Sequence, residues 1–313
     1  MSLRLITVFI LLIGVLVATP GAAFAATPEP SPRGARLADT ASTSSAGFTH
    51  PGVFVGVDEL KTSKGHVRAG DEPWATLFDE LESSEYATRG APDFGDLVSA
   101  SDRDEPCDQA DTVGCASECG SFNIPDNGCT DELMDARAVY GQALLWWYTE
   151  DPQYARRAVA ILNAYASDFA GHVGSNGPLM AAWVSEMMIR GAEIIRYTYE
   201  PGLDDPQFQV RAFTRMARTV LADTLSSFDY ANYNGNWKLS AADGLVNLGV
   251  FLDDRALYEQ GLEMWRERVP SYIYLESDGP LPIPPADSVY LALRIQGCRW
   301  GLKPPVSSND LAM

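Results

Sequence analysis

The chain has 313 residues and is strongly acidic, with 42 aspartates and glutamates against 23 lysines and arginines and a formal net charge of −19. Such acidity argues against nucleic acid or an anionic membrane as a partner, and a polyanionic ligand would need a locally basic cleft. Hydrophobic residues make up 46% of the chain, which is typical of a globular protein with a well-buried core.

The first 25 residues are typical of a secretory signal peptide. Arg4 precedes an uncharged, largely apolar run over 5–18, and a small-residue stretch ends with Ala-Phe-Ala at 23–25. The apolar run is shorter than the roughly 20 residues that a membrane-spanning helix needs, which favours cleavage over an anchor. We therefore expect a secreted protein, extracellular or periplasmic, in which 26–46 form a disordered leader rich in Ala, Thr, Ser and Pro.

Four of the five cysteines lie close together in a C-x7-C-x3-C-x9-C arrangement. This spacing lacks the C-x2-C pairs of a zinc site, and no histidine lies among the cysteines, so we expect neither a metal nor another cofactor. Because an exported chain meets oxidising conditions, the pattern predicts two disulfides in an irregular segment, with the pairing left open. The four residues are Cys107, Cys115, Cys119 and Cys129.

From Thr130 onward, apolar residues recur at helical spacing and predict three helical hairpins in series. About two further helices are expected over 55–84. A D-P-Q-aromatic sequence occurs at 151–154 and again at 205–208, and it predicts the start of the second helix in the first two hairpins. The predicted helices are 130–150, one from Asp151-Pro152 to Gly171, one opened by 175–178, one opened by Asp205-Pro206, 237–252 and 253–270.

Helical hairpins in series either stack as an open solenoid or close into an α/α toroid, and periodicity leaves both open. After Pro270 the helical pattern fails, and 286–313 shows no sustained period.

Two loops that lead into predicted helices carry polar residues suited to catalysis. The stretch 230–237 holds three asparagines and three aromatic residues, although Asn236 could equally be a helix cap. The stretch 172–178 holds His172 and Asn176, and a lone histidine is more often a hydrogen-bonded structural residue.

Five segments in this order form a recognisable set. They are Thr49-His50-Pro51-Gly52-Val53 with Glu72-Pro73-Trp74, then 138–146, Ser175 to Leu179, Asn234-Gly235-Asn236-Trp237, and Phe251 to Arg255. The set resembles the alginate lyase family over roughly 48–283. This resemblance implies an all-α fold, an incomplete (α/α) toroid of helical hairpins, with a lyase-like domain over 47–283 and an irregular tail over 284–313.

The resemblance implies a secreted polysaccharide lyase, with an alginate-like, uronic-acid-containing polymer as its anionic partner and β-elimination as its reaction. The C5 proton beside a carboxylate is weakly acidic, so that carboxylate must be neutralised before a base removes the proton. The implied catalytic residues are Asn236 as neutraliser, with Tyr233, His172 and Tyr230 as candidates for base and acid. The implied substrate-binding residues are Asn176, Tyr140, Trp237 and Lys238.

The family continues into later helices that carry a histidine and a tyrosine, whereas this chain has no histidine after His172. We therefore expect a truncated or frameshifted C-terminus and an incomplete catalytic set. Two other functions stay open. One is an α/α-toroid glycoside hydrolase that uses carboxylates among Glu186, Glu193 and Asp243. The other is a non-catalytic carbohydrate-binding or helical-repeat protein.

Overall fold

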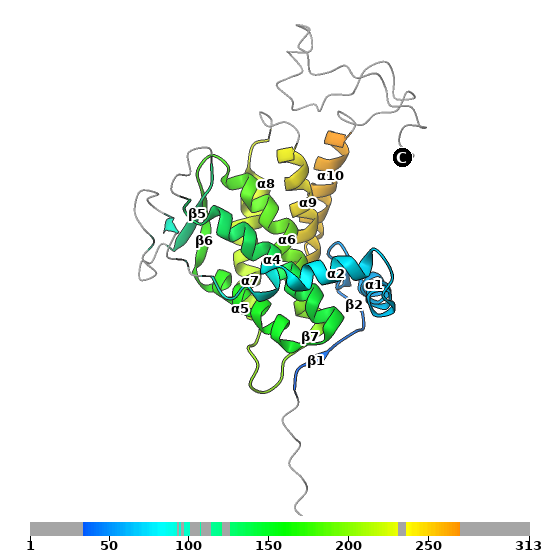
Figure 1. Ribbon diagram of the computed structural model, residues 1–313. Coiled ribbons are helices and arrows are strands. Elements are labelled where there is room, and N and C mark those ends of the chain that lie inside the picture. Colours follow the sequence, from blue (N-terminus) through cyan, green and yellow to red (C-terminus); the bar gives the residue numbers. More distant parts are fainter. Residues whose placement is uncertain are drawn as a thin grey trace, which may run out of the picture. The chain divides into compact units, whose positions relative to one another are not determined.

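The computed structural model describes residues 34–92, 94, 97–100, 107, 114–120, 126–230 and 236–269 (Figure 1). The predicted signal peptide, Tyr233 and the predicted tail lie outside the described residues. The described part is mostly helical, as predicted, with short strands in addition. No helix within it is long and apolar enough to cross a membrane.

The predicted hairpins are present, and the second helix of the middle hairpin is broken into three pieces, one of them a π-helical segment. The bounds are α1 Val57–Ala69, α2 Trp74–Ser83, α3 Glu85–Thr88, α4 Cys129–Thr149, α5 Pro152–Asp168, α6 Gly177–Thr198, α7 Val210–Met216, η2 Ala217–Ala222, α8 Asp223–Ser227, α9 Asn236–Phe251 and α10 Arg255–Arg268.

The first helices of the first two hairpins, α4 and α6, pack against each other (Figure 1), and two contacts that advance together along both helices show that they run parallel. Trp146 Nε1 donates to Thr198 Oγ1 at 3.2 Å near the C-terminal ends of both helices. About two helical turns earlier on each helix, Val139 contacts Gly191. A Cβ added at Gly191 would lie 2.7 Å from the Val139 backbone. Only glycine allows the two helices to approach this closely at that point.

Helix α9 continues the same parallel arrangement against α6. Arg190 Nη2 donates to Asp243 Oδ2 at 2.7 Å, and six residues further along α6, Arg196 Nη1 donates to the Phe251 carbonyl at 2.9 Å. Both links advance in the same direction along the two helices. The N-terminal ends of α4, α6 and α9 therefore lie at the same end of this row of first helices.

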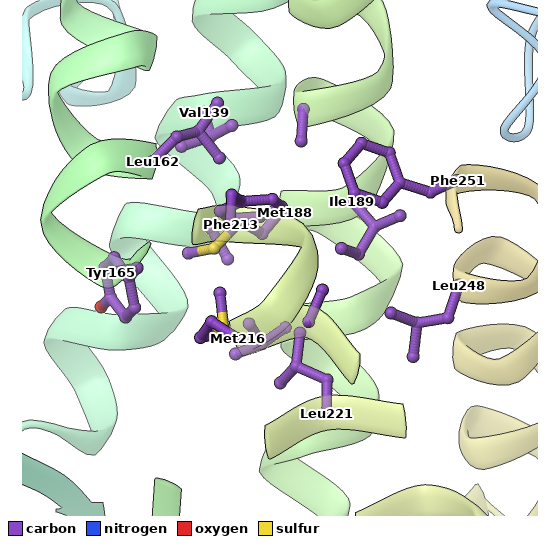
Figure 2. Packing of buried hydrophobic residues seen from close by; sticks show 14 of the residues in the cluster. Val139, Leu162, Tyr165, Met188, Ile189, Phe213, Met216, Leu221, Leu248 and Phe251 are labelled. Atoms are coloured by element: carbon purple, nitrogen blue, oxygen red, sulfur yellow. The ribbon is translucent and has the colours of Figure 1, made fainter. Parts of the chain in front are cut away.

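The core lies between this row of first helices and their partners. Figure 2 shows side chains from α4, α5, α6, α7, η2 and α9 directed into a common interior. Burial of each such aliphatic or aromatic side chain contributes about 1.5–3 kcal/mol to the stability of the fold. The labelled members are Val139, Leu162, Tyr165, Met188, Ile189, Phe213, Met216, Leu221, Leu248 and Phe251.

The two D-P-Q-aromatic sequences have different roles, which corrects the prediction. Asp151 caps α5, where its side chain accepts from Gln153 N at 2.9 Å. Asp205 caps no helix, because its side chain accepts from Gly202 N at 2.8 Å and is also bound by Arg156 from α5. The following helix, α7, begins only at Val210.

The helix predicted to end at Gly171 ends at Asp168 instead, because the chain continues into a strand, β6 (Phe169–Val173). β6 pairs in parallel with β5 (Cys115–Glu118), which pairs antiparallel with β4 (Val98–Ser99). This small sheet lies in the segment that the sequence pattern left irregular.

The two predicted disulfides are present, and their pairing is Cys107–Cys115 and Cys119–Cys129. Cys119 directly follows β5 and Cys129 is the first residue of α4. The second bridge therefore ties the sheet to the N-terminal end of α4.

Part of the predicted disordered leader also has regular structure. Short strands β1 (Arg36–Leu37) and β2 (Ser42–Thr43) pair antiparallel with β7 (Tyr199–Glu200) and β3 (Thr49–His50). Within the described residues, the ordered chain thus starts before the predicted boundary at residue 47.

Candidate functional site

The end of the helix row where α6 and α9 begin carries the two predicted asparagines. Asn176 precedes α6 and is half-buried; its N–H donates to the Cys119 carbonyl at 2.8 Å and its carbonyl accepts from Met180 N at 2.9 Å. The Cys119–Cys129 bridge fixes the loop that holds it. Asn236 is exposed and is the first residue of α9. The parallel helices therefore place both asparagines at the same end of the row.

The residues that follow Asn236 turn into the protein. The half-buried Trp237 stacks on Phe228 with ring centroids 6.0 Å apart. Lys238 is buried, and its Nζ donates to Glu267 Oε2 on α10 at 3.0 Å. The positive charge of this predicted substrate-binding residue is thus already matched by a carboxylate. Its role toward a substrate stays a prediction.

His172 lies in a buried polar chain that links the sheet to α4. Its Nε2 lies 2.8 Å from Glu132 Oε1, and Ser117 Oγ donates to the other oxygen of that carboxylate at 2.5 Å. The imidazole is 1% exposed, and its Nδ1 has no hydrogen-bond partner among the described residues. A carboxylate that orients an imidazole is found in many catalytic sites, but it also suits a structural histidine.

Tyr230 is the described tyrosine among the candidates for proton transfer. It is buried and contacts Phe228 edge-to-face at 4.9 Å. Burial raises the pKa of its hydroxyl, so the phenol stays protonated at neutral pH. This state suits a proton donor better than a base.

A second polar group, which we call the mid-helix cluster, lies halfway along the row of first helices. It consists of Tyr140 on α4, Glu186 and Arg190 on α6, and Asp243 on α9. Its central contact is the Arg190–Asp243 ion pair, with 2.7 Å between Nη2 and Oδ2. The Arg190 guanidinium also lies 4.1 Å from the ring centre of Phe54, which belongs to the segment before α1.

The titratable groups of the mid-helix cluster shift one another. Burial raises the pKa of Glu186 to about 7, and the negative charge of Asp243 adds to the rise against the opposing charge of Arg190. Burial also raises the pKa values of Asp243 and Tyr140, and in both cases Arg190 opposes the rise. Half-buried groups with such shifts are frequent in functional sites.

Glu193, the third carboxylate considered for hydrolysis, has a structural environment instead. Its Oε1 lies 2.6 Å from His50 Nδ1 and accepts from Gly52 N at 3.0 Å. His50 Nε2 lies 3.1 Å from Asp253 Oδ1, so the imidazole bridges α6 to the residues between α9 and α10. Glu193 is fully buried and anchors the segment that carries Phe54.

A cavity of about 490 Å³ lies beside this segment, between residues 47–56 and helices α9 and α10. Its lining includes Phe54 and Asn247, and Asn247 follows Asp243 by one helical turn. Ligand pockets commonly have volumes of roughly 300–1,000 Å³. In the described part of the chain, no group of three or more His, Cys, Asp or Glu residues could hold a metal ion.

Arg190 and Phe54 were not found by reasoning from the sequence. A signal for Arg190 exists, because an arginine interrupts the apolar stripe between Met187 and Ile194. Phe54 carries no such signal, since its φ of 67° and its place over Arg190 depend on the anchored segment around it.

The comparisons with known proteins agree with the motifs. A model of the alginate lyase family matches residues 84–283, which include every described helix from α3 to α10. The Thr49–Val53 motif precedes the matched range, whereas Tyr140, Asn176 and Asn236 lie within it. Neither the curated proteins nor the solved structures gave a match. The family match spans more than half of the chain, and the protein therefore belongs to the alginate lyase family.

Proposed function

We propose that this protein is a secreted polysaccharide lyase that cleaves an alginate-like, uronic-acid-containing polymer by β-elimination. Membership of the alginate lyase family is the observation that carries this proposal. The two disulfides support secretion, because such bonds persist in oxidising compartments. The first helices of the hairpins are parallel, and their second helices pack alongside them. This arrangement supports an incomplete (α/α) toroid of helical hairpins.

The reaction requires neutralisation of a carboxylate and two proton transfers. A base removes the C5 proton, the electron pair forms the C4–C5 double bond, the C4–O bond breaks, and an acid returns a proton to the leaving oxygen. Asn236 is suited to hydrogen-bond the substrate carboxylate, because it is exposed at the positive end of the α9 dipole. In this proposal Asn176, Tyr140, Trp237 and Lys238 contribute to substrate binding.

The base and acid are proposed from a short list of residues. Tyr233 lies outside the described residues, three positions before Asn236 in the chain. His172 is oriented by Glu132 and Tyr230 stays protonated at neutral pH, so these two residues fit base and acid respectively. His172 can act as a base only if the buried imidazole becomes accessible to the substrate.

A glycoside hydrolase is the second candidate, and one observation favours it. Glu186 and Asp243 lie close enough to raise the pKa of Glu186, as expected for a carboxyl pair in which one member stays protonated. The ion pair of Asp243 with Arg190 weakens this interpretation, because it occupies the carboxylate that would act as base or nucleophile.

The products separate the candidates. A lyase acting on alginate forms a C4–C5 double bond, which absorbs ultraviolet light. A hydrolase forms new reducing ends without that absorbance, and a non-catalytic binder forms neither product. We expect ultraviolet-absorbing products from a uronate polymer, and reducing ends without absorbance would overturn the proposal.

Replacement of Asn236 by aspartate tests its proposed role. The carboxylate would repel the substrate carboxylate as negative charge develops on it, so we expect the rate to fall roughly a hundredfold or more. Stability should change by less than about 1 kcal/mol, because aspartate is favoured at a helix N-terminus.

A matched control is Gln153→Glu, which adds the same charge at the start of α5, at an exposed position. This variant should keep the wild-type rate of product formation. If Asn236→Asp also kept that rate, Asn236 would only begin the helix and the site assignment would be wrong.

A further inference from the structure

We propose that Phe54, Arg190 and Glu186 form a subsite that binds one uronate residue of the polymer, halfway along α6 and separate from Asn236. The inference rests on the proposed function, since it takes a polyuronate as the ligand. It is carried by the contacts of Arg190, by the exposure of Phe54 and by the position of Glu186.

Arg190 has the chemistry to bind a carboxylate. Arg190 is 9% exposed, and its Nη2 donates to Asp243 Oδ2. Its Nε has no hydrogen-bond partner among the described residues. A buried guanidinium donor without a partner is costly, and a planar carboxylate is the ligand that guanidinium groups bind in a bidentate manner. Asp243 holds the guanidinium in place and remains 40% exposed through its side chain.

Phe54 supplies an apolar surface directly over this guanidinium. Its side chain is 67% exposed although its backbone adopts a left-handed conformation, with φ of 67°, that is unfavourable for an aromatic residue. The segment is held there because Glu193 binds both His50 and Gly52. A strained conformation that leaves a large ring in solvent gains nothing for the core, whereas a sugar ring could stack on it.

The cavity extends the surface that Phe54 offers. Phe54 lines the space of about 490 Å³ and also contacts the Arg190 guanidinium. A chain of sugar residues could therefore pass from the cavity across the phenyl ring to the guanidinium.

Glu186 sets the charge that a ligand would meet. When Glu186 is protonated, the Arg190–Asp243 pair leaves this part of the protein without net charge, and the acid can donate a hydrogen bond to a carboxylate. When Glu186 is ionised, the same part of the protein is negative and repels the ligand. The groups that act on its pKa are Arg190 on its own helix and Asp243 and Ser240 on α9. Tyr140 on α4 lies near Arg190.

The subsite therefore predicts a defined pH dependence of binding. The pKa of Glu186 in the free protein is about 7, and a bound anion raises it further. Affinity is then greatest below pH 7 and falls as the pH rises through that value, with a fraction of one proton taken up per ligand bound between the pKa values of the free and the bound protein. We expect the dissociation constant to be about tenfold larger at pH 8.5 than at pH 6.

The test is calorimetric binding of a uronate tetrasaccharide to the full-length protein, with ultraviolet absorbance followed in the same samples. Phe54→Ala should weaken binding roughly three- to tenfold, and Phe54→Tyr should bind like the wild type. Glu186→Gln should bind with little dependence on pH. A neutral tetrasaccharide should bind more weakly than the uronate and show no pH dependence.

The matched control is Trp265→Ala, because Trp265 is an aromatic residue on α10 that is 52% exposed. This variant should bind like the wild type, and equal weakening by both alanine substitutions would overturn the subsite. Unchanged affinity and pH dependence in both Phe54→Ala and Glu186→Gln would overturn it as well.

The same samples distinguish failure of the subsite from failure of the proposed function. Absorbing products together with unaltered binding in the variants would reject the subsite and leave the lyase. The expected binding differences without absorbing products would support the subsite and reject the lyase.

Discussion

Helix α6 carries two glutamates, Glu186 and Glu193, two turns apart, and their surroundings are opposite. Glu193 is fully buried and accepts hydrogen bonds from the segment that includes His50 and Gly52. Glu186 is half-buried, faces the like charge of Asp243, and has a pKa raised to about 7. The helical pattern of the sequence does not distinguish the two carboxylates. In the structure, Glu193 holds a segment of the fold, whereas Glu186 is a candidate for binding a ligand.

The difference teaches where the partners of a polar group come from. Glu193 receives the partners of its Oε1 from a distant part of the same chain, so the folded protein itself supplies these contacts. Glu186 has a carboxylate as its neighbour, and its protonation depends on pH and on what approaches from solvent. A group of the second kind is a candidate for binding a ligand, whereas a group of the first kind is a candidate for holding a loop.

The largest expected effect follows from removal of the buried carboxylate. Glu193→Ala leaves the buried His50 without its closest partner and frees the segment that holds Phe54. Loss of one member of a buried ion pair typically costs about 3–5 kcal/mol, so we expect the free energy of unfolding to fall by that amount. Urea denaturation at pH 6 measures it.

Glu186→Ala is the control, and it should cost less than about 1 kcal/mol because Arg190 stays paired with Asp243 in the variant and burial disfavours the charge of Glu186. Equal losses for the two substitutions would remove the distinction between the carboxylates.

The sequence was sufficient for much of the fold because local signals agreed with tertiary packing. Apolar periodicity located α4, α6, α9 and α10 within a few residues, and Asp151 caps α5 as its Asp-Pro pair predicted. Four clustered cysteines predicted two disulfides, although not their pairing. The family resemblance, which the match over 84–283 confirms, came from motifs and not from periodicity.

The failures arose where a distant residue decided the local structure. Asp205 repeats the pattern of Asp151, but Arg156 from α5 binds its side chain and the helix begins later. Helix α5 ends before Gly171 because β5, far away in the sequence, pairs with the residues that follow. Tyr140, Glu186 and Asp243 were candidates from the sequence, but their grouping around Arg190 in the mid-helix cluster was missed for the same reason, since it requires the parallel register of three helices.

A smaller effect of opposite sign is expected at Glu186. A carboxyl with a raised pKa in the folded state loses stability as the pH rises from the unfolded value, 4.5, to the folded value, about 7. Glu186→Gln removes this loss. It should therefore stabilise the protein by about 1–2 kcal/mol at pH 8, a value reduced for the partial exposure of the group.

The stabilisation by Glu186→Gln should disappear near pH 4, where the wild-type carboxyl is protonated in both states. Urea denaturation at the two pH values measures the difference. A variant that is equally stable or less stable at pH 8 would show that Glu186 is not held in an unfavourable charged state.

The smallest effect concerns His50, for which burial alone would lower the pKa. The hydrogen bonds and charges of Glu193 and Asp253 outweigh burial, so the pKa lies above its ordinary value of 6.5. A raised histidine pKa contributes stability that is present below pH 6.5 and is lost as the pH rises through the folded value. Asp253→Asn weakens this contribution through one partner only, and asparagine tolerates the left-handed backbone at that position, where φ is 55°.

Because the Asp253 side chain is 32% exposed, the loss at pH 5.5 should be below about 1 kcal/mol, and it should shrink at pH 8.5, where the imidazole is less protonated. Urea denaturation of the wild type and the variant at both pH values measures the loss in the free energy of unfolding. The part of the loss that disappears at pH 8.5 is due to the charge of the imidazole, and the rest is due to the hydrogen bond. A loss that is the same at both values would mean that Asp253 acts on a neutral imidazole, and that the carboxylates around His50 stabilise the loop through geometry alone.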